Sequence, residues 1–218
     1  MKNLIIFFVI SFCIPNLAFP QEKFNDNSPF LSLTGKNCLA VNIGLLNNTA
    51  AVVNTTGAGA SASTGFLGSF LYNHWVTDDW AIELNAGIVG AKAQSGVNSL
   101  GVEQSSAAVV PFLAGFRYYP MGFAMGNTVK PYIVVLVGAF NGYSSSNKVV
   151  FGSNIGSESK SQSVFGSKFG VGIDAFINSW MRVGLNTGFN LVSDFDEPVG
   201  QRKNYSGVEF SMSFGVVF

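Results

Sequence analysis

The last fifteen residues of the chain, 204–218, constrain its fold more than any other stretch. Large apolar residues occupy every second position there, namely Val208, Phe210, Met212, Phe214, Val216 and Phe218. Polar or small residues lie between them. An alternation with a period of two is typical of a β-strand with one apolar and one polar face. The sequence therefore predicts a two-faced strand that runs to the end of the chain.

Composition limits the class of protein. The chain has 218 residues, which suits one domain. Only 11% of the residues are charged and the formal net charge is zero, so no basic surface for nucleic acid is predicted. With 25 glycines, 21 phenylalanines and a positive mean hydropathy, a water-soluble fold would leave too much apolar surface exposed.

The amino terminus predicts export. Lys2 and the apolar run 4–14 are typical of a secretory signal peptide, because the run is too short to span a bilayer as a helix. We expect residues 1–20 to be this signal peptide and residues 21–35 to be a short periplasmic N-terminal segment. Cleavage would leave Cys38 as the only cysteine, so no internal disulfide is expected.

The rest of the sequence divides into eight stretches of alternating polarity, at 37–49, 61–75, 79–93, 105–119, 130–144, 162–177, 180–193 and 203–218. Short turns at 76–79 and 178–179 and a longer turn at 120–130 alternate with polar connectors. These connectors are Asn47–Ala62, Gln94–Gln104, Ser145–Ser161 and Ser193–Lys203. The pattern predicts an all-β fold over residues 36–218: an eight-stranded antiparallel up-and-down transmembrane β-barrel in a bacterial outer membrane, with both termini in the periplasm.

The two faces of the predicted strands differ in a way that indicates which one meets lipid. In the stretch 79–93, Trp80 and Ile82 lie on one face and Glu83 on the other. A soluble barrel would place bulky side chains inside and charges outside. Here glycines lie on the same face as the charges, and an eight-stranded barrel has little room inside, so we expect the charged face to line the lumen and the bulky apolar face to meet lipid. The stretch 130–144 is apolar on both faces, so its orientation stays open.

The charged residues of the inward face form a predicted lumenal polar network of Glu83, Arg117, Lys168, Asp174, Arg182 and Glu209. Hairpin geometry places Glu83 opposite Arg117 and Asp174 opposite Arg182, and buried charges require such partners. Lys168 and Glu209 are expected to join the same network. The network either fills a plugged polar interior or forms a gate to a narrow conduit.

Aromatic residues gather beside the predicted short turns. We expect an aromatic girdle at the membrane–water interface, formed by Trp75, Trp80, Tyr118, Tyr132 and Trp180, because amphipathic rings prefer that interface.

Nothing in the sequence points to an enzyme or a metal site. His74 is the only histidine, and it lies at the end of a strand beside a short turn, where a lipid-modifying triad would not reach the outer leaflet. One histidine and one mature cysteine cannot form a zinc site. The acidic residues of the last connector, Asp194, Asp196 and Glu197, are interpreted as a solvated loop. No catalytic, metal or cofactor-binding residues are therefore predicted.

Three segments carry a family resemblance. Phe70–Leu84 reads as a strand, a short Thr-Asp turn and a second strand, and Val110–Tyr119 looks like the strand that follows. The terminal alternation of Phe210, Met212, Phe214, Val216 and Phe218 is similar to the signal that the barrel-assembly machinery reads. Over about residues 36–218, the chain resembles the outer-membrane β-barrel domain family, which includes small OmpA-like and OmpW-like porin-family proteins. The resemblance implies the fold and an outer-membrane location, and it implies no single activity.

The first hypothesis for function is a non-enzymatic outer-membrane barrel with a structural or surface-interaction role. Its partners would be outer-membrane lipids, the barrel-assembly machinery during biogenesis, and an extracellular ligand bound through the loops, with Ser145–Ser161 as the best candidate. The alternative is a narrow porin-like channel for small or hydrophobic solutes. A third hypothesis is a lipid-modifying outer-membrane enzyme that depends on His74.

Overall fold

A computed structural model describes residues 32–49, 64–98, 101–120, 124, 128–150, 153–200 and 202–218. The expected signal peptide at 1–20, residues 21–31 of the expected segment 21–35 and most of the connector Asn47–Ala62 lie outside these residues.

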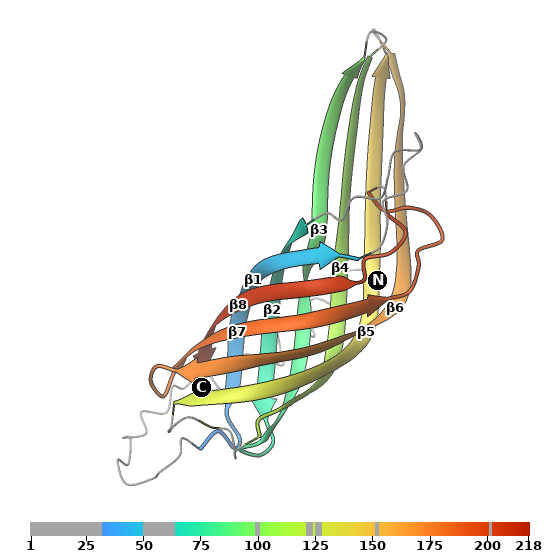
Figure 1. The fold of residues 1–218 in the computed structure, drawn as a ribbon. Helices are drawn as coiled ribbons and strands as arrows, with labels where there is room; N and C mark the ends of the chain where they lie inside the picture. The colour runs from blue at the N-terminus through green and yellow to red at the C-terminus, as the bar shows by residue number, and fades with distance from the viewer. Residues whose placement is uncertain are drawn as a thin grey trace, which may run out of the picture.

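The described chain is an all-β barrel, as predicted (Figure 1). Its strands are β1 (Asn37–Asn48), β2 (Thr64–Trp75), β3 (Trp80–Asn98), β4 (Gly101–Tyr118), β5 (Val129–Val150), β6 (Ser153–Phe176), β7 (Met181–Val192) and β8 (Gly207–Val217). Each strand pairs antiparallel with its sequence neighbours, and β8 closes the barrel on β1 in a ladder from Cys38–Val217 to Asn48–Gly207. Closure leaves the first and last strands without a free edge within this ladder.

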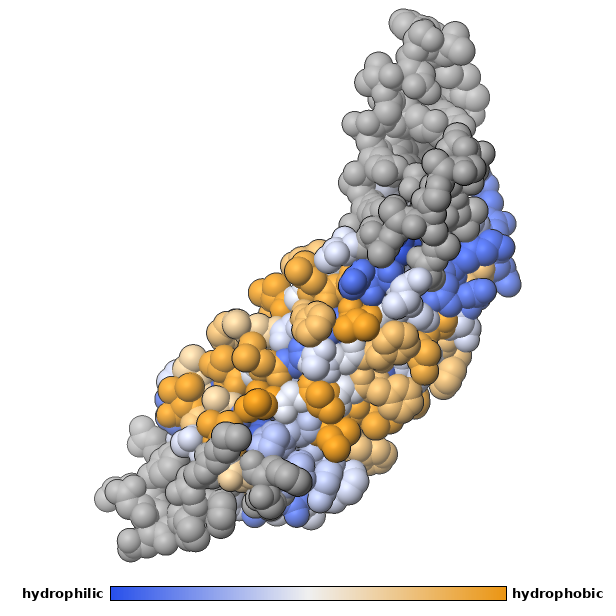
Figure 2. Space-filling view, viewed as in Figure 1, coloured by the Kyte–Doolittle hydropathy of each residue, from blue (hydrophilic) through white to orange (hydrophobic). Residues whose placement is uncertain are grey.

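The predicted inside-out arrangement is confirmed by the burial pattern. Large apolar side chains such as Phe70, Phe112 and Phe165 are more than half exposed. Figure 2 shows hydrophobic residues over much of the visible surface of the barrel. The interior holds buried polar side chains instead: Asn42, Ser69, Asn73, Glu83, Asn85, Arg117, Lys168, Asp174, Arg182, Asn186, Asn190, Glu209, Ser211 and Ser213. An exterior this apolar requires a hydrocarbon environment. No helix in the described part of the chain is long and apolar enough to cross a membrane.

Strand β5 has an orientation that the sequence left open. Ile133, Val135 and Val137 are exposed on the outside, whereas Val134 and Leu136 are fully buried inside. The interior is therefore asymmetric: this side is apolar, whereas Asn186, Ser211, Ser213, Asn42 and Ser69 form a polar wall across the middle of β7, β8, β1 and β2.

Four strands are longer than predicted and project beyond the barrel (Figure 1). The pairing of β3 with β2 ends at Val89, and the pairing of β6 with β7 ends at Gly166. Beyond these points β3, β4, β5 and β6 pair only with one another. We term this projection the wing, comprising 90–98, 101–108, 143–150 and 153–163.

The wing corrects two predicted connectors. Most of Gln94–Gln104 and Ser145–Ser161 is not loop, because strand pairing continues to Asn98–Gly101 in one hairpin and to Val150–Ser153 in the other. Outside the lipid a strand needs no apolar face, so polar residues sustain the ladder through backbone hydrogen bonds and the alternation of polarity disappears.

Candidate functional site

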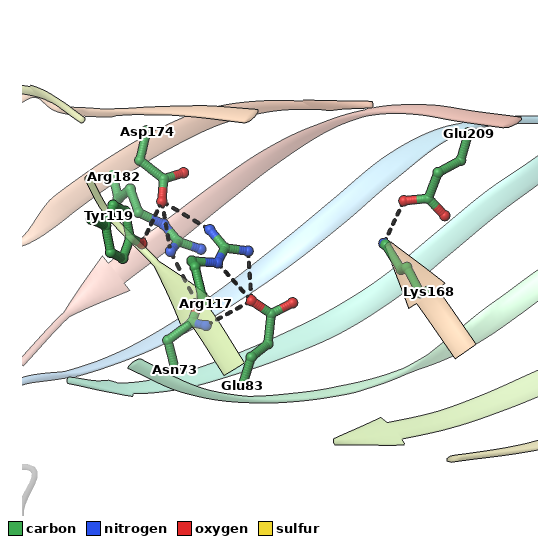
Figure 3. Close-up of polar contacts among 8 residues, drawn as sticks. All are labelled: Asn73, Glu83, Arg117, Tyr119, Lys168, Asp174, Arg182 and Glu209. Atoms are coloured by element: carbon green, nitrogen blue, oxygen red, sulfur yellow. Dashed lines mark hydrogen bonds and ion pairs between the residues drawn. The ribbon is translucent and has the colours of Figure 1, made fainter. Parts of the chain in front are cut away.

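A cluster of buried charges crosses the lumen near the end of the barrel that carries the short turns. Arg117 on β4 joins two carboxylates: its Nε donates to Glu83 Oε2 at 2.7 Å, and its Nη1 donates to Asp174 Oδ2 at 2.8 Å (Figure 3). Arg182 on β7 also contacts Asp174, at 3.3 Å. These contacts tie β3, β4, β6 and β7 together across the lumen.

Neutral groups complete the cluster. The Nδ2 of Asn73 on β2 donates a hydrogen bond to Glu83 Oε2 at 2.9 Å. Its Oδ1 accepts a hydrogen bond from Nη1 of Arg182 at 3.1 Å. Tyr119, just after β4, donates its hydroxyl to Asp174 at 2.7 Å. Asn73 was not among the predicted site residues, although it lies on the inward face of β2 with Ser69 and Leu71.

The predicted pairs Glu83–Arg117 and Asp174–Arg182 are confirmed as contacts, but they are not directly opposite in the sheet. Glu83 is opposite Gly115, and Asp174 is opposite Gly184. Each arginine lies two positions along its strand from the glycine that is opposite the carboxylate, and it reaches the carboxylate diagonally. At Gly184 the missing side chain makes room for this contact, since a Cβ there would overlap the Asp174 carboxylate.

The second part of the predicted network forms a separate pair. Lys168 on β6 forms an ion pair with Glu209 on β8. Glu209 also accepts a hydrogen bond from Nδ2 of Asn190 at 2.9 Å. In Figure 3 this pair lies apart from the Arg117 cluster. The expectation of one continuous network is therefore wrong, because uncharged residues such as Asn186, Ser211 and Ser213 separate the two groups along β7 and β8. The predicted residues balance as three acids and three bases, so the lumen has no net charge from them.

The predicted aromatic girdle divides into two groups. Trp80 and Trp180 are 48% and 53% exposed, and Trp80 packs on Tyr118 with ring centroids 4.6 Å apart. Trp75 and Tyr132, by contrast, are buried inside the barrel, so their assignment to the girdle is wrong. In the alternation of β2 and of β5, both residues occupy positions whose side chains point into the lumen. Trp75 packs on Tyr119 and Phe176, and the Tyr132 ring lies 3.9 Å from the Arg117 guanidinium carbon.

The terminal strand presents its apolar face outward. Phe210, Met212, Phe214 and Val216 are all exposed, and the backbone of Phe218 pairs with Asn37 through two hydrogen bonds. The recognition of these residues by an assembly machinery stays a prediction.

Residues 32–36 close the end of the barrel that has the short turns. Leu33 is fully buried, and Gly35 adopts a positive φ of 78° that lets its amide donate to the Trp75 carbonyl at 2.8 Å. The Asp78 carboxylate accepts hydrogen bonds from the amides of Leu33 and Thr34, at 2.6 and 2.9 Å. This segment and the Trp75–Phe176 contact fill the opening.

Asp78 makes this closure dependent on pH. Partial burial disfavours its ionised form, but hydrogen bonds from Thr34 and Leu33 outweigh burial and hold the pKa of Asp78 below its usual range. A lowered folded-state pKa stabilises the closure at neutral pH, and this contribution is lost as the pH falls through that pKa. We expect Asp78→Asn to raise amide exchange at Leu33 and Thr34 at pH 7, by local opening worth about 1 kcal/mol. In the wild type the protection of these two amides, taken relative to intrinsic exchange at each pH, should fall only in acid, and protection that stays constant as the pH falls would contradict this.

The opposite end is closed by the segment 193–206 between β7 and β8. Phe195, Val199 and Tyr205 are buried, and the rings of Phe195 and Tyr205 pack edge to face at 6.1 Å. A Cβ at Gly142 of β5 would overlap Val199, so the segment packs directly on the inner face of that strand. Burial raises the pKa of Tyr205 to about 12, so its hydroxyl stays protonated and donates to the Val199 carbonyl at 2.6 Å.

Polar contacts hold this segment against the wing. Glu197 forms an ion pair with Lys160 at 2.7 Å, and its backbone exchanges two hydrogen bonds with the side-chain amide of Gln162. The barrel is thus filled at both ends by apolar side chains and crossed by charges between them.

His74 takes part in a small contact away from the charged cluster. Its Nδ1 lies 2.9 Å from Asn37 Oδ1, which also accepts the hydroxyl of Tyr72. In the described residues no three His, Cys, Asp or Glu side chains gather as a potential metal site.

Comparisons with known proteins support the architecture. The structure of Ail, the attachment invasion locus protein of Yersinia pestis, in complex with the heparin analogue sucrose octasulfate, matches with a TM-score of 0.51 and 12% identity over 85% of this chain and 99% of that chain. The chain has the outer-membrane β-barrel fold. The match to the outer membrane protein OprG of Pseudomonas aeruginosa covers 85% of this chain and 96% of that chain, at 16% identity and a TM-score of 0.48. No family model matches the sequence, and no curated protein matches it.

Proposed function

We propose that this barrel is a non-enzymatic protein of a bacterial outer membrane, closed to solutes, that presents its wing to the exterior. The observation that carries the proposal is the closure of both ends, by Leu33 and Trp75 at one and by Phe195, Val199 and Tyr205 at the other. In a barrel of eight strands, the interior is only wide enough for side chains.

Orientation follows from the same geometry. The ladders place the first residues of β1 beside the last residues of β8 and beside the tight turn after β2, and the wing projects from the other end of the barrel (Figure 1). Barrels of this type have short periplasmic turns and longer extracellular loops. We infer that the wing is extracellular and that both termini are periplasmic, where the assembly machinery would meet the Phe218 end.

A planar-bilayer measurement tests the closed state. We expect the purified, inserted barrel to give no conductance steps at neutral pH, because the apolar side chains at both ends leave no continuous polar path. Insertion is controlled by heat-modifiable gel migration and by protection of the barrel from protease. Steps from the fully inserted wild type would contradict the proposal.

One observation favours a narrow channel as the second candidate. Several inward polar atoms have no hydrogen-bond partner within the described part of the chain: those of Asn42, Ser69, Asn186, Ser211 and Ser213. They line the polar wall between the two ion-paired groups, and buried polar atoms normally have partners such as water. Conductance steps whose size changes in Glu83→Gln would favour this candidate.

A further inference from the structure

An apolar groove crosses the lipid-facing surface of the barrel from β5 to β1. Its volume is about 950 Å³, and no charged residue lines it. One wall is a single cross-strand row of outward side chains: Pro131, Ile173, Leu185, Met212 and Ile43. The other wall is the next outward row: Ile133, Val171, Thr187 and Phe210. The groove therefore crosses β5, β6, β7 and β8 and the seam where β8 closes on β1.

The backbone forms the floor of the groove. One inward row also lines the groove: Tyr132, Gly172, Asn186 and Ser211. Side chains of this row point into the lumen, so only its main chain faces outward. The two walls lie two residues apart along each strand, which is about 7 Å. Because carbon atoms in contact lie about 3.5–4.0 Å apart, this width fits one hydrocarbon chain with a wall on each side.

The groove rises from the edge of the membrane toward its middle. On β5 its first wall lies at Pro131, two positions after the first residue of the strand, Val129. On β1 the same wall lies at Ile43, six positions after Asn37. Both strands begin at the end of the barrel that carries the short turns. At the usual rise and tilt of a barrel strand, four further residues gain about 10 Å in depth. One leaflet contributes about 15 Å of hydrocarbon, so the groove spans most of a leaflet.

The lower end of the groove meets the exposed aromatic rings. Ile133 of the second wall is opposite Tyr118, and Tyr118 is opposite Trp80, on which it packs. Amphipathic rings of this kind lie at the headgroup level of a membrane. A lipid with its headgroup at this level can therefore extend a chain into the groove from its lower end.

The surroundings of the groove indicate its occupant. Hydrocarbon covers the apolar exterior, and a groove left empty there would lose its van der Waals contacts on one side. A flexible acyl chain fills a narrow oblique groove without displacing any side chain. A second barrel would have to insert a matching row of its own side chains between the two walls. Lipids of the opposite leaflet have their headgroups beside the wing, at the end of the barrel away from the lower end of the groove.

We propose that the groove binds one acyl chain of a phospholipid in the periplasmic leaflet. This proposal rests on the outer-membrane location and the orientation proposed above. Pro131 and Ile133 contact the part of the chain nearest the headgroup, and Met212 and Ile43 contact its end. The bound chain covers the seam between β8 and β1 on the outside of the barrel.

The test is methyl NMR of the mature chain in phospholipid nanodiscs that contain a trace of phospholipid with a nitroxide in the middle of one acyl chain. Leu185 and Leu84 are matched reporters, because each lies four positions after the first residue of its strand. They are 57% and 47% exposed, and only Leu185 lines the groove. We expect paramagnetic relaxation about tenfold stronger at Leu185, which corresponds to a preference of about 1.4 kcal/mol over other lipid positions.

Two matched variants locate the contact. Val171 lines the groove and is 51% exposed, whereas Val137 lies outside it on the outward face of β5 and is 48% exposed. Val171→Phe fills the groove, so relaxation at Leu185 should fall to the level of Leu84. Val137→Phe makes the same change elsewhere on the lipid-facing surface and should leave the excess at Leu185 intact.

Equal relaxation of Leu185 and Leu84 in the wild type, or the same response to both substitutions, would overturn the proposal. Weaker relaxation at Leu185 than at Leu84 would also overturn it, because something other than lipid would then cover the groove. Failure of the proposed location looks different, since the wild-type chain would insert into none of the nanodiscs. Failure of the proposed orientation is separate again, since protease added to whole cells would leave the wing intact while the nanodisc result holds.

Discussion

Replacing Arg117 with methionine is expected to lower the free energy of unfolding by about 3–5 kcal/mol, the cost of removing one partner from a buried ion pair. Arg117 is 1% exposed and contacts both Glu83 and Asp174. Without it, Asn73 is the one hydrogen-bond partner left to Glu83 among the described residues, while Asp174 keeps Arg182 and Tyr119. Unfolding by urea in detergent micelles or in a bilayer measures the change.

Two controls separate charge from packing. Lys160→Met removes a lysine from an exposed pair with Glu197, and we expect little change because solvent screens that pair. The double variant Glu83→Gln/Arg117→Met should recover part of the loss, because the uncompensated carboxylate is gone. A loss that is the same for Lys160→Met and Arg117→Met would contradict the assignment of a buried cluster.

Placing a charge on the lipid-facing surface is expected to have the second large effect on the stability of the barrel. Phe112 is 55% exposed and lies midway between Tyr118 and Ser106 on the lipid-facing side of β4. We expect Phe112→Lys to destabilise the inserted barrel by about 2–4 kcal/mol, as for a lysine at the bilayer midplane. The measurement is unfolding from a phospholipid bilayer.

Ser106→Lys is the matched control, since it lies on the same face of the same strand but within the wing. We expect almost no change there, because the wing stands in water and headgroups. Equal destabilisation by both substitutions would show that the hydrocarbon extends further along β4 than we infer. No effect of Phe112→Lys would show that this face of β4 does not contact lipid.

The sequence predicted the barrel through its period-two alternation, which exists wherever one face meets lipid and the other meets the lumen. It failed where this contrast ends. Ser145 and Ser159 are directly paired in the wing, yet a serine-rich stretch has no alternation and was interpreted as a loop. Backbone pairing between neighbouring hairpins, which sequence patterns do not report, sustains those strands.

The site was predictable in part for the same reason. Alternation placed Glu83, Arg117, Asp174 and Arg182 inside, and buried charges then had to meet. Trp75 was assigned to the interface by its residue type, although its phase with Asn73 already favoured the lumen. The diagonal reach of the arginines over Gly115 and Gly184 depends on strand tilt and stagger, which hairpin arithmetic does not include.

Quenching of the native tryptophans by lipids brominated near the headgroup end of the chain tests the inside-out barrel most directly. Three variants each keep one tryptophan and replace the other two with phenylalanine. Trp80 and Trp180 should be strongly quenched because their rings face lipid, and Trp75 should not, because it is fully buried in the lumen. Strong quenching of Trp75 together with weak quenching of Trp80 and Trp180 would contradict the arrangement of apolar exterior and charged interior.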